Sequence, residues 1–228
     1  FSGFFISWFI EKIREKRLVK AGLGLILCAA ILPVVNMPTG IGDASATGYT
    51  NLGSICIKTG EYDNAIIALK QAIALRPSDA APYNDIGYVY MIKEDYKEAE
   101  RYILDSLSKD PTYSFAHINL GLLREKEGNL KSAEKEYLLA ISLNPNIPQA
   151  HNNLAGLYER AGKRSLAIKE YQKAIELDPE NAKTHYNLGV IYGRSGRLKD
   201  AKAEFIESFR LDPDSVATRK ALDYFLFS

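Results

Sequence analysis

Cysteine, histidine and tryptophan are scarce in this sequence. Its 228 residues include two cysteines, Cys28 and Cys56, which lie in segments of very different character. Two such residues cannot build a disulfide framework or a four-ligand zinc site. Net charge is low as well, because 29 basic residues face 28 acidic ones. The chain therefore lacks the positive field that holds a polyphosphate backbone, and we expect no nucleic-acid partner.

Motifs of the common enzyme classes are also missing after residue 45. That part of the sequence holds no phosphate-binding loop, nucleophile elbow, paired His-Glu zinc motif or dinucleotide fingerprint. We therefore predict that residues 46–228 are not an enzyme and that they hold no catalytic residue, no cofactor and no metal.

One long apolar run stands near the N-terminus. Residues 18–37 read LVKAGLGLILCAAILPVVNM, with strongly polar side chains only near the two ends. A helix of this length covers about 30 Å, which matches the hydrocarbon core of a bilayer. We predict a transmembrane helix at residues 18–37, an apolar and basic juxtamembrane segment at residues 1–17 and a linker at residues 38–45.

The charge beside this run predicts its orientation. Residues 11–20 carry five cations and two acids, and the positive-inside rule keeps such a segment in the cytoplasm. We therefore expect a membrane location with a single span in this chain and the following domain on the non-cytoplasmic side. The alternative is a cleavable export signal that ends at the small residues 44–46.

From residue 46 onward the sequence repeats itself every thirty-four residues. The period is marked by the prolines Pro77, Pro111, Pro145, Pro179 and Pro213. It divides the chain into five blocks, residues 46–79, 80–113, 114–147, 148–181 and 182–215. Position 20 of every block is alanine, and position 8 is glycine or alanine. Small residues at two such positions let a pair of helices cross closely.

Each block predicts two amphipathic helices, because apolar residues recur at spacings of three and four. Glycine at position 15 ends the first helix in four blocks, and the proline ends the second. Glu94 replaces this glycine in the second block, so we expect that block to make its turn differently.

These patterns closely resemble the tetratricopeptide repeat (TPR) family over residues 46–215. The resemblance implies an all-α fold, a right-handed superhelical solenoid whose concave face is made by the first helix of each block. Residues 216–228 fit a capping helix, because charge replaces the apolar positions that a further repeat would cover.

Position 6 carries an amide or a carboxylate in every block, and in the TPR family this position faces the concave groove. Amides donate and accept hydrogen bonds together, so a line of them can pair with the backbone of an extended peptide. The line resembles the asparagine ladder in the repeat arm of O-linked N-acetylglucosamine transferases. Its members are Asn51, Asp85, Asn119, Asn153 and Asn187. The alternative is that these side chains bond a neighbouring helix.

Position 13 adds a line of cations. Such a line would favour a partner that carries carboxylates, although cations also suit the last turn of any helix. The line consists of Lys58, Lys126, Arg160 and Arg194, with Ile92 as the exception. We predict that the two lines together bind a protein or peptide partner.

The three histidines, His117, His151 and His185, share position 4 of their blocks. Repeated helices stand about 8–10 Å apart, whereas the ligands of one zinc ion each lie about 2 Å from it. We therefore expect partly buried histidines with a structural role.

We interpret the protein as a membrane-anchored scaffold that binds a partner segment in the groove of its repeats. In one alternative, the chain is the C-terminal part of a multi-pass membrane glycosyltransferase whose catalytic part lies upstream, since it begins with Phe1 and an aromatic apolar run. In another, it is an accessory or assembly subunit of a membrane complex. Self-association is a further alternative, because solenoid surfaces are extended.

Overall fold

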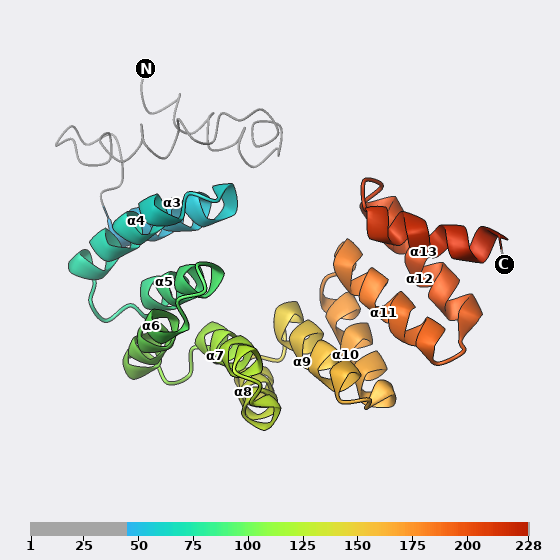
Figure 1. The fold of residues 1–228 in the computed structure, drawn as a ribbon. Helices are drawn as coiled ribbons and strands as arrows, with labels where there is room; N and C mark the ends of the chain where they lie inside the picture. The colour runs from blue at the N-terminus through green and yellow to red at the C-terminus, as the bar shows by residue number, and fades with distance from the viewer. Residues whose placement is uncertain (1–44, 228) are drawn as a thin grey trace, which may run out of the picture. The chain divides into compact units, whose positions relative to one another are not determined.

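The structure is a computed structural model, and it describes residues 45–227. All the regular elements among these residues are α-helices, so the predicted all-α fold is confirmed there (Figure 1). The helices are α3 (Ala46–Thr59), α4 (Tyr62–Leu75), α5 (Ala80–Ile92), α6 (Tyr96–Lys109), α7 (Ser114–Lys126), α8 (Leu130–Leu143), α9 (Pro148–Arg160), α10 (Arg164–Leu177), α11 (Ala182–Arg194), α12 (Leu198–Leu211) and α13 (Val216–Phe227). Each thirty-four-residue block holds one pair of helices.

The predicted transmembrane helix at residues 18–37 lies outside the described residues, and so do the segments 1–17 and 38–44. Over residues 45–227, no helix combines the length and the apolar character that a bilayer crossing requires. Membrane attachment therefore stays a prediction from the sequence.

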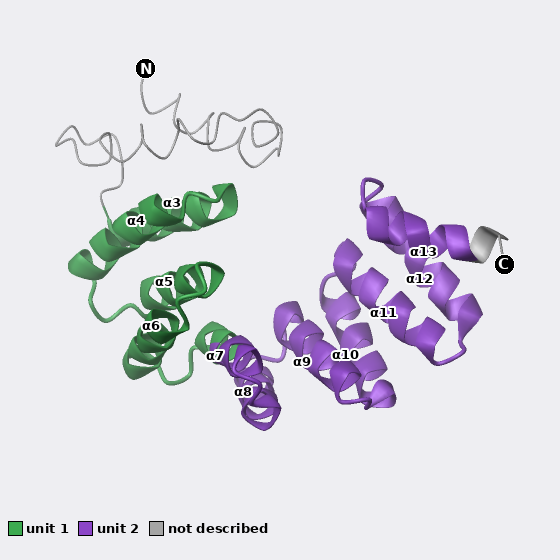
Figure 2. Ribbon diagram, viewed as in Figure 1, with its two compact units in different colours: residues 1–119 green, residues 120–228 purple. Residues whose placement is uncertain are grey.

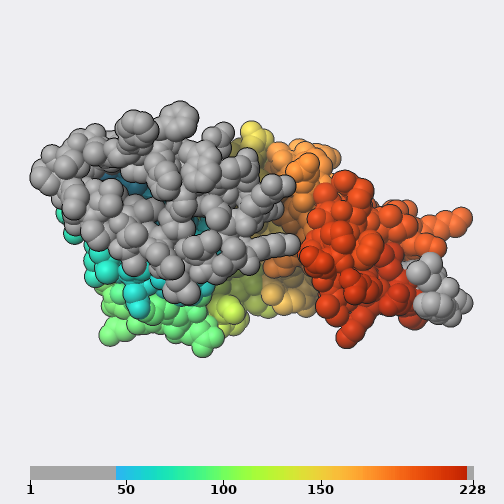
Figure 3. Space-filling view, turned by 90° about the horizontal axis from the view of Figure 1, so that it is seen from above, coloured from blue at the N-terminus to red at the C-terminus, as the bar shows by residue number. Residues whose placement is uncertain are grey.

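The chain divides into two compact units, residues 1–119 and residues 120–228, and the division falls inside α7 (Figure 2). In the first unit, α3 pairs with α4, α5 pairs with α6, and α4 packs against α5. In the second unit, α9 pairs with α10, α11 pairs with α12, and successive pairs pack through α8 on α9 and α10 on α11. The last helix, α13, packs on α12, and the two helices form one continuous surface in the space-filling view (Figure 3).

Close packing within each pair follows from the small residues at positions 8 and 20. The alanine at position 20 is completely buried in all five blocks. Where position 8 is glycine, it receives the side chain of position 24, so that Gly87 meets Ile103 and Gly189 meets Phe205. The predicted crossing of the two helices at these positions is therefore present in the structure.

The turn between the two helices of a pair uses a left-handed residue. Gly60, Gly128, Gly162 and Gly196 have φ values from 72° to 82°. The second block makes the same turn with Glu94 at φ 60°. Our expectation of a different turn in that block is therefore wrong, because Glu94 adopts the left-handed conformation that glycine adopts in the other four blocks.

We predict that the change Glu94→Gly raises the free energy of unfolding by about 1 kcal/mol, since a side chain in the left-handed region costs about that much. The reverse change, Gly162→Ala at φ 72°, should lower it by a similar amount. Urea denaturation followed by circular dichroism measures both shifts. An unchanged or lower midpoint for Glu94→Gly would show that the turn is not strained.

Position 4 ties each loop to the helix that follows it. The side chain at this position bonds the carbonyl oxygen of the proline at position 32 of the preceding block. The bonds are Tyr83 to Pro77 (3.1 Å), His117 to Pro111 (3.1 Å), His151 to Pro145 (3.0 Å), His185 to Pro179 (3.0 Å) and Arg219 to Pro213 (3.0 Å). The histidines thus have the structural role that we expected. The hydrogen bond to the proline carbonyl oxygen explains why polar residues recur at position 4.

His185 has two acceptors, because its Nδ1 also lies 2.7 Å from a carboxylate oxygen of Glu204 while its Nε2 faces the Pro179 carbonyl. Both nitrogens can donate only when the ring is protonated. The hydrogen bond to Glu204 accordingly raises the pKa of His185 above its usual value.

A raised pKa makes part of the stability pH-dependent. We expect this part to be fully present below the unfolded-state pKa of about 6.5 and to be lost as the pH rises through the folded-state pKa. The stability gap between the wild type and His185→Gln should therefore shrink between pH 6 and pH 9. The change Glu204→Gln should flatten this dependence, and a gap that stays constant or grows with pH would contradict the assignment.

Candidate functional site

The five side chains at position 6 lie on the first helices of the pairs, but their surroundings differ. Asn51 is exposed, whereas Asp85, Asn153 and Asn187 are half-buried. Asn119 is only 9% exposed. The five residues therefore occupy equivalent positions on their helices, but they differ in exposure and do not form a uniform surface.

Asn119 bonds within the fold. Its Nδ2 donates to Oδ1 of Asn84, on the neighbouring first helix α5, at 2.8 Å. Asn84 is itself buried and stands at position 5 of its block. For Asn119 the geometry is thus that of our alternative interpretation, a bond to a neighbouring helix.

Asp85 continues this network in the first unit. It accepts a hydrogen bond at 3.3 Å from Asn84 Nδ2, and the Ser54 hydroxyl on α3 lies against the same carboxylate. Burial raises the pKa of Asp85, and the charge of Asp79 adds to this effect. The hydrogen bonds from Asn84 and Ser54 act in the opposite direction, since they favour the charged form.

In the second unit, Asn153 on α9 and Asn187 on α11 keep part of their surface accessible. The two helices contact each other. Gly156 lies one turn after Asn152 and Asn153, and a Cβ there would meet only the Tyr171 hydroxyl, at 3.6 Å. Oδ1 of Asn152 accepts a hydrogen bond from the Thr184 hydroxyl on α11 at 3.3 Å. The face of α9 therefore has room beside Asn153, whose amide can offer a donor and an acceptor to an extended backbone.

The arginines at position 13 are paired within the second unit. Arg194 donates to Glu159 at 2.5 Å, and Arg160 forms the equivalent bond to Glu125. The same glutamates accept hydrogen bonds from the hydroxyls of Tyr171 (3.2 Å) and Tyr137 (2.9 Å). Burial and the adjacent glutamate raise the pKa of both tyrosines. We call this arrangement the Tyr-Glu-Arg bridge; it occurs twice.

The sequence analysis missed the glutamates of this bridge. Glu125 and Glu159 occupy position 12, directly before the predicted line of cations. Their partners stand at fixed separations, a tyrosine 12 residues later and an arginine 35 residues later, and this spacing was the available signal. Because each arginine already has a carboxylate, two of the four predicted cations have a partner inside the protein.

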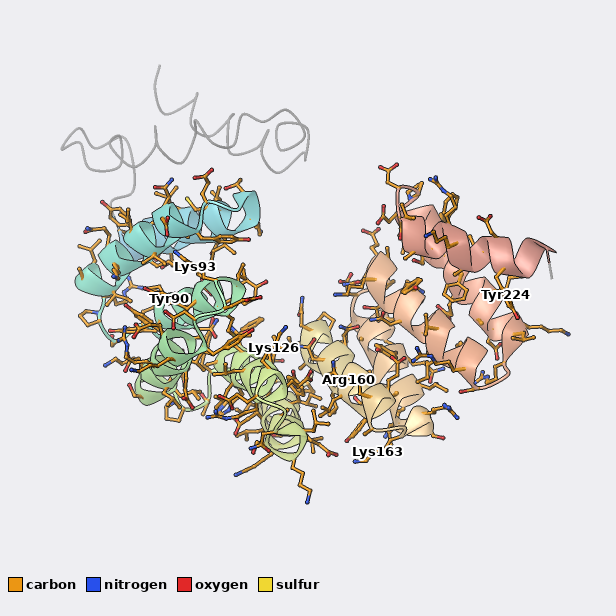
Figure 4. All side chains as sticks on the ribbon, viewed as in Figure 1. Tyr90, Lys93, Lys126, Arg160, Lys163 and Tyr224 are labelled. Atoms are coloured by element: carbon orange, nitrogen blue, oxygen red, sulfur yellow. The ribbon has the colours of Figure 1, made fainter. Side chains whose placement is uncertain are left out.

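The other two cations, Lys58 at the end of α3 and Lys126 at the end of α7, are exposed. Figure 4 labels Lys126 together with Arg160, which ends α9. Position 13 is therefore chemically mixed, and it does not form a single basic stripe in either unit.

Apolar side chains on the first helices of the first unit were also missed. Tyr88 and Ile92 on α5 are each 38% exposed, and Phe115 on α7 is 45% exposed. The Phe115 ring packs against Tyr113, with centroids 5.8 Å apart. The first helices of this unit thus carry exposed rings as well as the half-buried Asp85 carboxylate.

No group of three or more His, Cys, Asp or Glu side chains that could hold a metal ion occurs among residues 45–227. The described part of the chain offers hydrogen-bonding amides, a half-buried acid and exposed apolar side chains. Such a set is suited to binding a segment of another molecule.

Two family models match the chain. The model described as TPR repeat matches residues 46–93 and 160–196, and the model described as tetratricopeptide repeat matches residues 80–113, 116–147 and 182–215. Together they cover most of the five blocks. No curated protein matches the chain.

Solved structures match it as well. YrrB, a TPR protein with an unusual peptide-binding site, is 25% identical with a TM-score of 0.54, over 78% of this chain and 92% of YrrB. MamA from Desulfovibrio magneticus RS-1, from its residue 41 to the end, is 26% identical with a TM-score of 0.56, over 75% of this chain and 97% of that one. A chain of the Cut9–Hcn1 complex of the APC/C is 17% identical with a TM-score of 0.74, over 89% of this chain and 40% of that one.

Proposed function

Because this chain belongs to the tetratricopeptide repeat family, we propose that it is a protein-interaction scaffold that binds an extended partner segment on the exposed face of its first helices. The observation that carries the proposal is the pair of half-buried amides on contacting helices, Asn153 on α9 and Asn187 on α11. Equivalent amides one repeat apart can bond peptide groups about three residues apart in an extended chain, whatever its sequence.

The likeness to YrrB supports a peptide ligand, since YrrB is a TPR protein with a peptide-binding site. The arginine–glutamate pairs of the second unit change which partner chemistry we expect there. Arg160 and Arg194 bond Glu125 and Glu159, so they are less suited to a partner's carboxylates than unpaired cations would be. The interaction in this unit would depend mainly on amides and backbone groups.

The test is a double variant, Asn153→Ala with Asn187→Ala, in the full chain. We expect it to keep the helical circular dichroism spectrum and to lose at least tenfold in affinity for the partner segment that the wild type retains in native membranes. A matched control is Lys169→Ala with Lys173→Ala, because both lysines are exposed on the second helix α10. Equal retention of the segment by the amide variant and the control would contradict the proposal.

We also propose that residues 18–37 anchor the repeats to a membrane, with the repeats on the non-cytoplasmic side. The length of the apolar run and the cations of residues 11–20 support this proposal. Protease protection tests it, and digestion of the repeats by a protease added to the cytoplasmic side would contradict the orientation. The upstream glycosyltransferase and the assembly subunit stay alternatives that only the sequence pattern suggests.

A further inference from the structure

The first unit holds one carboxylate in place with hydrogen-bonding groups from all three of its first helices. Asn119 on α7 donates to Asn84 on α5, and Asn84 donates to Asp85 on the same helix. The Ser54 hydroxyl on α3 also bonds this carboxylate. Asn84 and Asn119 are buried, so the orientation of Asp85 is fixed by groups that solvent does not reach.

None of the salt bridges among residues 45–227 includes this carboxylate. The groups that shift the pKa of Asp85 are its burial, Asn84, Ser54 and the acid Asp79. The two glutamates of the Tyr-Glu-Arg bridge differ, because each of them faces an arginine. A half-buried acid without a cation is poorly solvated, and it gains more from an opposite charge than an exposed acid does.

Aromatic rings adjoin the same acid. Tyr88 follows Asp85 by one helical turn and is partly exposed. Burial raises the pKa of Tyr113 to about 12, and the charge of Asp85 adds to this effect. The Phe115 ring packs on the Tyr113 ring, with centroids 5.8 Å apart. Exposed rings beside a carboxylate attract a cation in two ways, by charge and through the faces of the rings.

We propose that these residues form a recognition site for a single basic side chain of the bound segment. The site, which we call the Asp85 cluster, consists of Ser54, Asp85, Tyr88, Tyr113 and Phe115. Arginine fits it better than lysine, because the flat guanidinium stacks on a ring while its N–H groups reach a carboxylate. The inference rests on the proposed function, and it replaces the acidic partner that the cations at position 13 favoured.

The bound segment would carry apolar residues beside its arginine. Ile92 lies two turns beyond Asp85 on α5, and its side chain is 38% exposed where other blocks place a cation. An apolar residue of the partner can cover it, whereas an acidic one would meet Asp85 and Asp79 with like charge.

The experiment uses the full chain in lipid nanodiscs and three fluorescein-labelled twelve-residue peptides. The peptides alternate leucine and serine around one central residue, which is arginine, its neutral analogue citrulline, or glutamate. Fluorescence anisotropy gives the three dissociation constants at low and at high salt. We expect the arginine peptide to bind at least tenfold more tightly than the citrulline peptide, with the glutamate peptide weaker still.

The variant Asp85→Asn keeps an acceptor for Asn84 and removes only the charge. It should reduce the preference for arginine over citrulline to less than twofold, with an unchanged circular dichroism spectrum. The control Asp63→Asn removes an acid from the same unit at an exposed pair with Lys93, and it should keep the tenfold preference.

Three results would overturn the inference: no binding of the arginine peptide, equal binding of arginine and citrulline peptides by the wild type, or an unchanged preference in Asp85→Asn. Each of them leaves the proposed function standing if the amides Asn153 and Asn187 are required for retention of the native partner. If the native partner were retained without the amides of Asn153 and Asn187, the proposed function would be contradicted instead. Failure of the inference and failure of the proposed function are therefore distinguishable.

Discussion

Replacing Gly87 by alanine is expected to lower the free energy of unfolding by about 2 kcal/mol. The added Cβ would lie 2.7 Å from Ile103 Cγ1 and 3.2 Å from the carbonyl oxygen of Ala99. Ile103 is completely buried, and Ala99 O belongs to the backbone of α6, so neither atom can move away freely. The helices of this pair would have to separate, which weakens the core of the first unit.

The matched control is Gly156→Ala. This glycine also lies inside a first helix, but an added Cβ would meet only the Tyr171 hydroxyl at an ordinary contact distance of 3.6 Å. Alanine is the better helix former, so the control should be neutral or more stable by up to about 1 kcal/mol. The denaturation midpoints of the two variants measure this difference in stability. Equal losses would show that helix crossing at position 8 does not limit the side chain.

Replacing Tyr171 by alanine is expected to cost about 3–5 kcal/mol. The side chain is 2% exposed, and its hydroxyl donates to Glu159, which also accepts from Arg194. The variant therefore opens a cavity between α9 and α10 and takes one donor from the Tyr-Glu-Arg bridge. Thermal and urea denaturation of the full chain measure the loss.

The variant Tyr171→Phe separates the two contributions, because it keeps the ring and removes the hydroxyl. We expect it to cost about 1 kcal/mol, the usual size of one hydrogen bond. If phenylalanine and alanine were equally destabilising, the ring would not fill the space between the helices, and the packing described here would be incorrect.

Much of the architecture was predictable from the thirty-four-residue period. The period depends on small residues at positions 8 and 20 and on the proline at the end, and each has a direct physical consequence for helix crossing or helix ending. Glu94 shows the limit of such reasoning, because the turn geometry is imposed by the packing of both helices and the residue adapts to it. The pattern of glycines at position 15 did not predict the left-handed conformation of Glu94.

The candidate binding face was less predictable, because its character depends on hydrogen-bond partners a whole repeat away. Asn119 belongs to the same line as Asn153, yet Asn84 accepts its amide hydrogen and withdraws it from the surface. Arg160 stands in the predicted line of cations, yet Glu125 bonds it. Neither partner lies on the helix of the residue that it binds, so periodicity along one helix gave no indication of the pairing.

Site-specific crosslinking tests the central claim most directly. A photoreactive residue at position 153, on the amide face of α9, is compared in native membranes with one at position 169, exposed on α10. We predict crosslinks from position 153 to one defined extended segment, identified by mass spectrometry, and none to that segment from position 169. Contacts from position 169 alone, or no contact from position 153, would contradict partner binding on the first helices.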